Sequence, residues 1–153
     1  MGLDMMLYAR EKGVKRDNAE EIGYWRKFNA LHSYIVTEIG KNPESNCEYI
    51  EMLETDIDTL LEKLGRIKEI LDGAPKLKFE TNEWGGKEYS TWDYDEKTQD
   101  TVAKILAPKD GFFWGSTDIN SYYYNNILES IKIFIEAKRR VQAGQIVEYS
   151  SWW

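Results

Sequence analysis

Two segments, Leu3-Asp4-Met5-Met6-Leu7-Tyr8-Ala9 and Gln145-Ile146-Val147-Glu148-Tyr149-Ser150-Ser151-Trp152-Trp153, decide the fold of this chain. The first is short, mostly apolar and without a helix cap, which is typical of a β-strand. The second is also strand-like, and its two tryptophans carry too much apolar surface to be left in water. We therefore expect the tail to pair beside the N-terminal strand, in a small antiparallel sheet that includes both termini.

Three main helices are expected to pack against this sheet. Apolar residues recur at helical spacing from Phe28 to Ile39, and the pattern stops at Gly40. A second stripe, with Thr55 and Asp58 as its capping residues, runs to Gly73. The third helix is expected to begin at a Ser116 or Thr117 cap and to end at Gly144. The sequence thus predicts an α+β fold, with residues 1–153 forming one domain.

The segments between these elements give weaker patterns. The basic and acidic residues of 10–21 predict a solvated loop, and the alternation in 47–52 predicts a short strand. Residues 74–92 contain two adjacent glycines and scattered aromatics, which indicates a loop or an irregular hairpin. A modest helix is expected over 94–106, and the aromatic run 111–115 reads as a buried strand or a tight turn.

Composition excludes several classes of protein. The single cysteine, Cys47, excludes an intramolecular disulfide, and no secretory signal or lipidation motif is recognisable. No apolar run approaches the roughly 20 residues that cross a bilayer. We therefore expect a cytoplasmic protein that does not reside in a membrane.

The charge balance bears on possible partners. The chain carries 27 acidic and 20 basic residues, for a formal net charge of −7. Binding to duplex nucleic acid depends on Lys and Arg that neutralise phosphates, so duplex DNA is not the expected partner. A local cationic pocket for a small phosphorylated ligand is still compatible with this net charge, because the field in a hollow depends on nearby charges.

The densest chemistry lies in Tyr24-Trp25-Arg26-Lys27-Phe28-Asn29-Ala30-Leu31-His32, which we expect at the start of the first helix. It combines aromatics and cations with an amide and the only histidine, so it is the best candidate for a surface that contacts a ligand. Arg and Lys can bind phosphate or carboxylate groups, Arg through its planar fork and Lys as a point charge. The alternative is an ordinary solvated face, although cations at a helix N-terminus oppose the helix dipole.

No catalytic signature or metal motif is present, and no cofactor is expected. His32 lies within an apolar stripe, where a hydrogen-bonded core histidine is favoured over a catalytic one. Catalysis by Cys47 would need a base, and His32 is the only imidazole available. Acidic clusters such as Asp93, Asp95 and Glu96 are expected by chance among so many carboxylates, although a dense acidic surface can also mimic the phosphates of DNA.

Gly115-Ser116-Thr117, ahead of the third expected helix, has the composition of an anion site. Free backbone N–H groups and the positive end of the helix dipole favour negative ligands there. Asp118 would repel a phosphate, so capping by Ser116 or Thr117 is the favoured interpretation.

Several of these motifs together resemble a family of small proteins encoded by bacteriophages and prophages. Its members typically open MGLDMYL, contain GYWRKAN-x-IH and SGFFFGST, and end near YYQSSW. The matching stretches here are Met1-Gly2-Leu3-Asp4-Met5, Gly23-Tyr24-Trp25-Arg26-Lys27 with Asn29 and His32, Gly111-Phe112-Phe113 with Gly115-Ser116-Thr117, and Tyr149 with Ser151-Trp152. The chain departs from the pattern at Met6, Phe28, Asp110 and Trp114, at the glutamine of the tail, and across residues 74–104.

The family has no settled activity, so the resemblance implies a setting, that of phage accessory proteins which act on host metabolism or defence. We expect a non-catalytic binder that sequesters a small phosphorylated ligand such as a nucleotide immune signal in the cytoplasm of a bacterial host, and a homo-oligomeric form is compatible with this role. The alternatives are an acidic protein that inhibits a host nucleic-acid enzyme and, third, an enzyme that cleaves nucleotides with His32 and a carboxylate. The expected ligand-binding residues are Asp4, Tyr24, Trp25, Arg26, Lys27, Asn29, His32, Ser116, Thr117, Tyr149 and Trp152.

Overall fold

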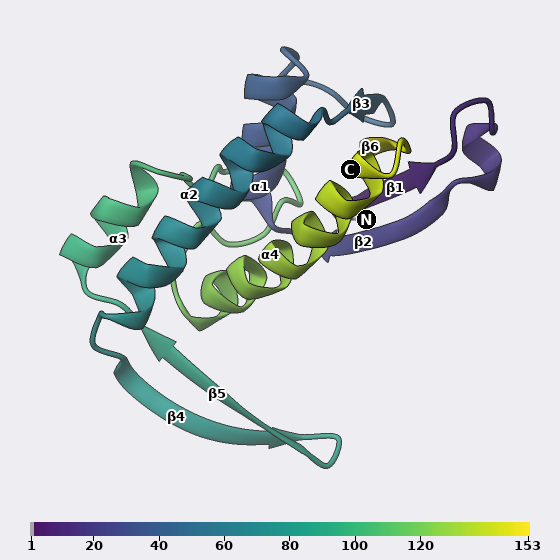
Figure 1. The fold of residues 1–153 in the computed structure, drawn as a ribbon. Coiled ribbons are helices and arrows are strands. Elements are labelled where there is room, and N and C mark those ends of the chain that lie inside the picture. Colours follow the sequence, from purple (N-terminus) through teal and green to yellow (C-terminus); the bar gives the residue numbers. More distant parts are fainter. Residues whose placement is uncertain (1) are drawn as a thin grey trace.

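The two end segments pair with each other in the centre of one sheet, as the sequence predicts. In the computed structural model, which describes residues 2–153, β1 (Asp4–Arg10) and β6 (Ile146–Trp152) pair antiparallel along their whole length. β2 (Glu20–Arg26) flanks β1 and β3 (Tyr49–Glu51) flanks β6, giving the order β2-β1-β6-β3. The two ends of the chain therefore lie close together (Figure 1). Met1, the first residue of the phage-family motif, is outside the described residues.

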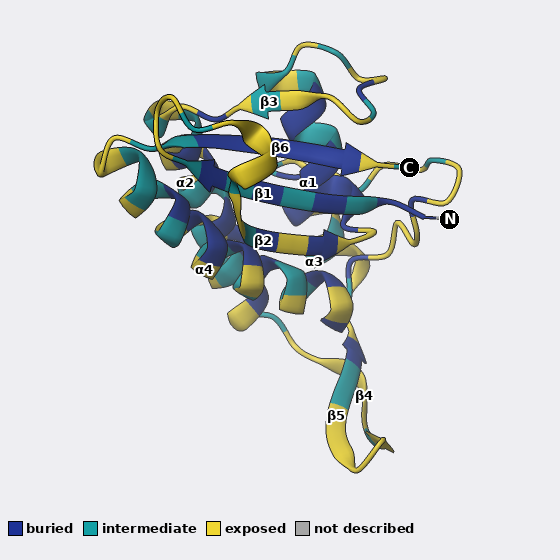
Figure 2. Cartoon of the chain, turned by 90° about the vertical axis from the view of Figure 1, so that its right-hand side faces the viewer, coloured by how far each residue is buried: buried dark blue, intermediate teal, exposed yellow. Residues whose placement is uncertain are grey.

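One face of the sheet is covered by the helices, and the other, called the open face below, is open in part, since Glu148 and Ser150 on that side are buried. Met5, Leu7 and Ala9 of β1 are buried, whereas the residues between them are partly exposed. Successive side chains of a strand point to opposite faces, so the buried set faces the helices and the other set faces outward. Figure 2 shows the sheet from its open side, with the helices behind it. This open face carries part of the candidate site.

The helices confirm the α+β class. α2 (Glu54–Asp72) and α4 (Ser121–Gln142) pack together, and α4 also contacts β2 and β6. α1 (Asn29–Tyr34) continues into a π-helical turn, η2 (Ile35–Ile39), and α3 (Glu96–Ala103) is the modest helix expected from the sequence. None of the helices within residues 2–153 is long and apolar enough to cross a membrane.

The prediction that Tyr24, Trp25 and Arg26 begin a helix is wrong. They belong to β2, which follows a short 3-10 turn, η1 (Arg16–Asn18), inside the segment expected to be a loop. The Trp25 side chain therefore points into the core, where its Nε1 donates a hydrogen bond of 2.8 Å to Ser130 Oγ. Hydrogen bonding to β1 makes this segment a strand, because pairing with a strand elsewhere in the chain outweighs a weak local propensity.

Two predicted helix caps are also wrong. α4 begins at Ser121, and Asn120 Oδ1 accepts from the backbone N–H groups of Tyr122 and Tyr123, so Ser116 and Thr117 lie in the preceding loop. At α2 the Asp56 carboxylate accepts from the Leu53 N–H at 3.0 Å, in place of the expected Thr55 and Asp58. A cap needs a side-chain acceptor aimed at free N–H groups, and several nearby residues satisfy the same sequence rule.

Residues 74–92 form the irregular hairpin, one of two alternatives expected from the sequence. β4 (Leu77–Trp84) and β5 (Lys87–Asp93) are joined at Gly85 and Gly86, which both have positive φ. The hairpin projects away from the other elements (Figure 1). At its base Trp92 stacks on Phe79 and contacts Tyr124 of α4. The tip leaves Trp84 81% exposed.

The aromatic run 111–115 forms the tight turn that was expected as an alternative to a strand. The Trp114 N–H donates to the Gly111 carbonyl at 3.0 Å. Trp114 is buried, whereas Phe112 and Phe113 are exposed. The backbone of this turn also holds the start of β1, because the Leu3 N–H donates to the Phe113 carbonyl at 3.2 Å.

A pair of glycine substitutions tests the packing of the sheet on α4. A Cβ at Gly23 would lie 2.5 Å from Ile133 Cγ2, whereas a Cβ at Gly65, inside α2, would meet nothing within 4 Å. We expect Gly23→Ala to destabilise the fold by about 1–3 kcal/mol through overpacking, and Gly65→Ala to stabilise it by about 0.5–1 kcal/mol. Urea unfolding of both variants measures the difference; equal effects would contradict this account of the interface.

Candidate functional site

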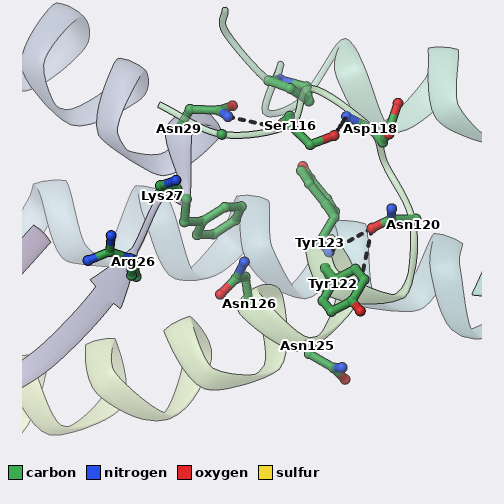
Figure 3. Close-up of a pocket in the computed structure, with 13 residues that line it drawn as sticks. Arg26, Lys27, Asn29, Ser116, Asp118, Asn120, Tyr122, Tyr123, Asn125 and Asn126 are labelled. Carbon is green, nitrogen blue, oxygen red and sulfur yellow. Dashed lines mark hydrogen bonds between the residues drawn. The ribbon is translucent and has the colours of Figure 1, made fainter. Parts of the chain in front are cut away.

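A hollow of about 390 Å³ lies where β2 ends and α4 begins. Figure 3 shows it between Arg26 and Lys27 on one side and the first turns of α4 on the other. Four of the residues expected from the sequence to bind a ligand line it. The lining consists of Arg26, Lys27, Phe28, Asn29, Pro108, Gly115, Ser116, Asp118, Asn120, Tyr122, Tyr123, Asn125 and Asn126.

Lys27 is held on the rim by an unusual backbone conformation. Its φ is +58°, in the left-handed region that residues with a side chain seldom adopt. Its N–H donates to the Leu3 carbonyl at 2.8 Å, and a Cβ at Gly115 would lie only 2.9 Å from Lys27 Cβ. No carboxylate within residues 2–153 forms an ion pair with its ammonium group, so this positive charge is left for a ligand.

Arg26 stands between this hollow and the open face of the sheet. Its side chain is 55% exposed, and Nη1 lies 3.1 Å from Oδ1 of Asp4. An exposed ion pair of this kind contributes little to stability and exchanges readily with other partners. The guanidinium group therefore remains able to bind an anion.

Asn29 supports the hollow with an amide that is fully engaged. Its Nδ2 donates to the carbonyls of Trp114 and Ser116, at 3.2 and 2.8 Å, and its Oδ1 accepts from the Lys109 N–H at 2.9 Å. The side chain is buried. Asn29 thus fixes the 109–116 loop beside α1, and its contribution to a ligand site is to position that loop.

The opposite wall comes from the beginning of α4. Asn120 caps the helix, and it lines the hollow together with Tyr122 and Tyr123, so the positive end of the helix dipole lies beside the hollow. The amides of Asn125 and Asn126 add uncharged donors, which the sequence analysis missed. The sequence feature that could have identified them is the pair of consecutive asparagines a few residues after the cap of α4. Asp118 is the one carboxylate in the lining, and it opposes a negative ligand.

His32 and Tyr149 lie in the core, outside the hollow. His32 is fully buried, its Nδ1 is 2.7 Å from the Tyr149 hydroxyl, and its ring meets that of Trp114 edge to face at 4.8 Å. Burial lowers the pKa of His32 to about 4, so the imidazole is neutral at pH 7. Burial raises the pKa of Tyr149. The structural role expected as the alternative for His32 fits this geometry.

The remaining predicted residues divide between the core and the surface. Trp25 is buried against α4, and Thr117 is exposed without lining a hollow. Asp4, Tyr24 and Trp152 lie on the open sheet face, where the Tyr24 hydroxyl donates to Asp4 Oδ1 at 2.5 Å. Of the expected ligand-binding residues, only Arg26, Lys27, Asn29 and Ser116 therefore line the first hollow.

Cys47 and His32, the nucleophile and the base considered from the sequence, have different partners in the structure. Within residues 2–153 no group of three or more His, Cys, Asp or Glu side chains gathers as a metal site. Cys47 is exposed and its thiol contacts Asn46, whereas the His32 ring is occupied by Tyr149 and Trp114. The nucleophile and base considered from the sequence are thus not paired with each other.

Comparisons with protein-family models, with curated proteins and with solved structures gave no match. The candidate site is therefore argued from its geometry, and the resemblance to the phage family stays a prediction.

The burial of His32 predicts a pH-dependent stability. In the unfolded chain His32 has its ordinary pKa of 6.5 and is protonated as the pH falls below that value. In the folded chain its pKa is about 4, so the buried imidazole stays neutral until the pH approaches 4. We expect the free energy of unfolding to fall by on the order of 3 kcal/mol across this window, more than in a His32→Gln variant. Urea titrations at pH 7 and 4.5 measure both proteins. If both proteins lose the same free energy of unfolding between pH 7 and 4.5, His32 is not buried as described and its imidazole contacts solvent.

Proposed function

We propose that this protein binds and sequesters a small phosphorylated ligand in the hollow between β2 and α4. The observation that carries the proposal is the convergence of Arg26, Lys27 and the N-terminal end of α4 on one concave site. Lys27 supplies an unpaired charge, Arg26 a planar fork and α4 the positive end of its dipole. Each favours a phosphate, and their fields add in a hollow.

The lining favours capture over turnover. It contains Arg26, Lys27 and Asp118 as charged groups, without a histidine or a cysteine. General acid–base chemistry needs a group whose pKa lies near the working pH, and the only histidine of the chain is in the core. These features support binding without chemistry, in preference to the nucleotide-cleaving alternative.

The resemblance to phage and prophage proteins supplies the setting for the proposal. A protein that only binds must be present in amounts comparable to its ligand, and it then lowers the free concentration of that ligand by mass action. A host signalling molecule, present in small amounts, suits removal of this kind. We therefore propose an anti-defence role in the bacterial cytoplasm, and a homo-oligomeric form would be compatible with it.

Lys27 and Lys41 provide a matched test of this proposal. Both are exposed lysines with left-handed backbone, at φ +58° and +57°, but Lys41 lines none of the hollows. We expect Lys27→Gln to weaken binding of pyrophosphate and of ADP about tenfold or more, because a charge-assisted contact is lost. Lys41→Gln should bind as the unsubstituted protein does. Isothermal titration calorimetry at low salt measures both.

Two results would remove the proposal. One is the absence of binding for pyrophosphate, ribose 5-phosphate, mononucleotides and cyclic dinucleotides alike. The other is an equal loss of affinity in the Lys27 and Lys41 variants, which would indicate a general effect of net charge.

An acidic surface supports a second candidate function, the inhibition of a host protein that handles nucleic acid. Asp93, Asp95, Glu96 and Asp118 line a further hollow of about 440 Å³ at the base of the projecting hairpin. Asp95 is partly engaged, since it caps α3 by accepting from the Thr98 N–H at 2.7 Å. The remaining carboxylates face solvent and are suited to a basic protein surface.

Charge reversal separates this candidate from ligand capture. If a basic partner binds the acidic hollow, Glu96→Lys should weaken the complex about tenfold, whereas Glu62→Lys on the exposed surface of α2 should not. Pull-down from host lysate with each variant measures this, and Lys27→Gln should retain the partner. A stoichiometric partner lost with Lys27→Gln but kept with Glu96→Lys would contradict the second candidate.

A further inference from the structure

Another hollow, called the second hollow below and separate from the acidic one at the hairpin, lies beside the first. One ion pair connects the residues that line the first and second hollows. The second hollow has a volume of about 220 Å³ and is lined by Gly2, Asp4, Trp152 and Trp153. Arg26 lines the first hollow, and its Nη1 lies 3.1 Å from the carboxylate of Asp4, which lines the second. A Cβ at Gly2 would lie 3.0 Å from both Arg26 Nη2 and Lys27 Cε, so the cations lie against the start of the chain as well. Arg26 and Asp4 therefore connect the linings of the two hollows.

Strand register explains why these groups are neighbours. Asp4 of β1 pairs with Arg26 of β2 on one side and with Trp152 of β6 on the other. Directly opposite residues of an antiparallel sheet share a face, with Cβ atoms about 5 Å apart. Arg26, Asp4 and Trp152 thus form one row across the open end of the sheet. The row places a cation, an acceptor and a large ring in that order.

Trp152 is a costly residue to leave in water. Its side chain is 67% exposed, although the five residues before it on β6 are all buried. An exposed indole beside a hollow offers a flat surface on which another ring can stack. Its neighbour Trp153 is fixed in place, because the Trp153 Nε1 donates to the Ser45 carbonyl at 3.0 Å and its ring contacts Trp114 edge to face.

Asp4 keeps a free acceptor in the same hollow. Its Oδ1 accepts from the Tyr24 hydroxyl and from Arg26, whereas its Oδ2 has no hydrogen-bond partner within residues 2–153. A carboxylate oxygen accepts hydrogen bonds from amino, ring N–H or hydroxyl groups. Nucleobases and ribose both present such donors. The two hollows thus offer complementary chemistry to the two ends of a nucleotide.

We infer that the phosphorylated ligand is a nucleotide whose base stacks on Trp152 in the second hollow. Its phosphate binds Arg26 and Lys27 in the first hollow, and Asp4 accepts from the base or the ribose. This inference depends on the proposed function and specifies the class of ligand. Of the two tryptophans expected from the sequence to bind the ligand, Trp152 is the one that can stack on a base, because Trp25 is buried in the core.

Two tryptophans on the surface give a matched experiment. Trp152→Ala removes the stacking ring, and Trp84→Ala removes a more exposed ring at the tip of the hairpin, which lines neither the first nor the second hollow. Calorimetry with ADP, GDP and pyrophosphate is carried out on both variants and on Asp4→Asn, with circular dichroism to verify folding. Pyrophosphate serves as the probe that lacks a base.

We expect Trp152→Ala to weaken ADP or GDP about tenfold or more while pyrophosphate affinity is unchanged. Asp4→Asn should reduce nucleotide affinity and leave pyrophosphate affinity equal or higher, since Arg26 loses a competing carboxylate. Trp84→Ala should behave as the unsubstituted protein does.

The inference is overturned if nucleotides bind no more tightly than pyrophosphate, or if Trp152→Ala and Trp84→Ala leave nucleotide affinity equally unchanged. In either case pyrophosphate binding that depends on Lys27 would keep the proposed function intact. If pyrophosphate and nucleotides both fail to bind, the proposed function and this inference fall together.

Discussion

The pairing of β1 with β6 is the constraint on which the rest of this structure depends. It joins segments about 140 residues apart and fixes their register from Asp4 opposite Trp152 to Arg10 opposite Ile146. Loop closure over such a separation costs entropy, which the buried residues of both strands must offset. Once formed, the pair supplies the edge on which β2 docks. The Leu3 backbone then holds both Lys27 and the turn at Phe113.

A buried polar contact accompanies this pairing. Tyr149 of β6 reaches His32 of α1, and the imidazole ring rests against Trp114 of the loop that frames the first hollow. Each of the three residues comes from a different part of the chain. A hydrogen bond in a low-dielectric interior is strong when satisfied, and costly when broken. His32 and Tyr149, which the sequence places among the expected ligand-binding residues, therefore connect sheet, helix and loop in the core.

Local charge and total charge have opposite signs in this protein. The chain carries a net charge of −7, yet Arg26 and Lys27 lie together at the end of β2 beside the first turn of α4. Field in a hollow is set by near groups, because solvent and salt screen distant ones beyond about 8–10 Å. The acidic surface elsewhere disfavours nucleic acid polymers, which is consistent with the small anionic ligand that we propose.

Elements whose signal is local can be predicted from the amino-acid sequence. Apolar periodicity predicts α1, α2 and α4, and the apolar ends predict β1 and β6, since burial of one face imposes a fixed spacing. The arrangement in space was needed to place Tyr24, Trp25 and Arg26 in a strand beside β1 and to pair His32 with Tyr149. It also decided that Arg26, Asp4 and Trp152 form one row. Each of these depends on a partner far away in the chain, and local propensity contains no information about such partners.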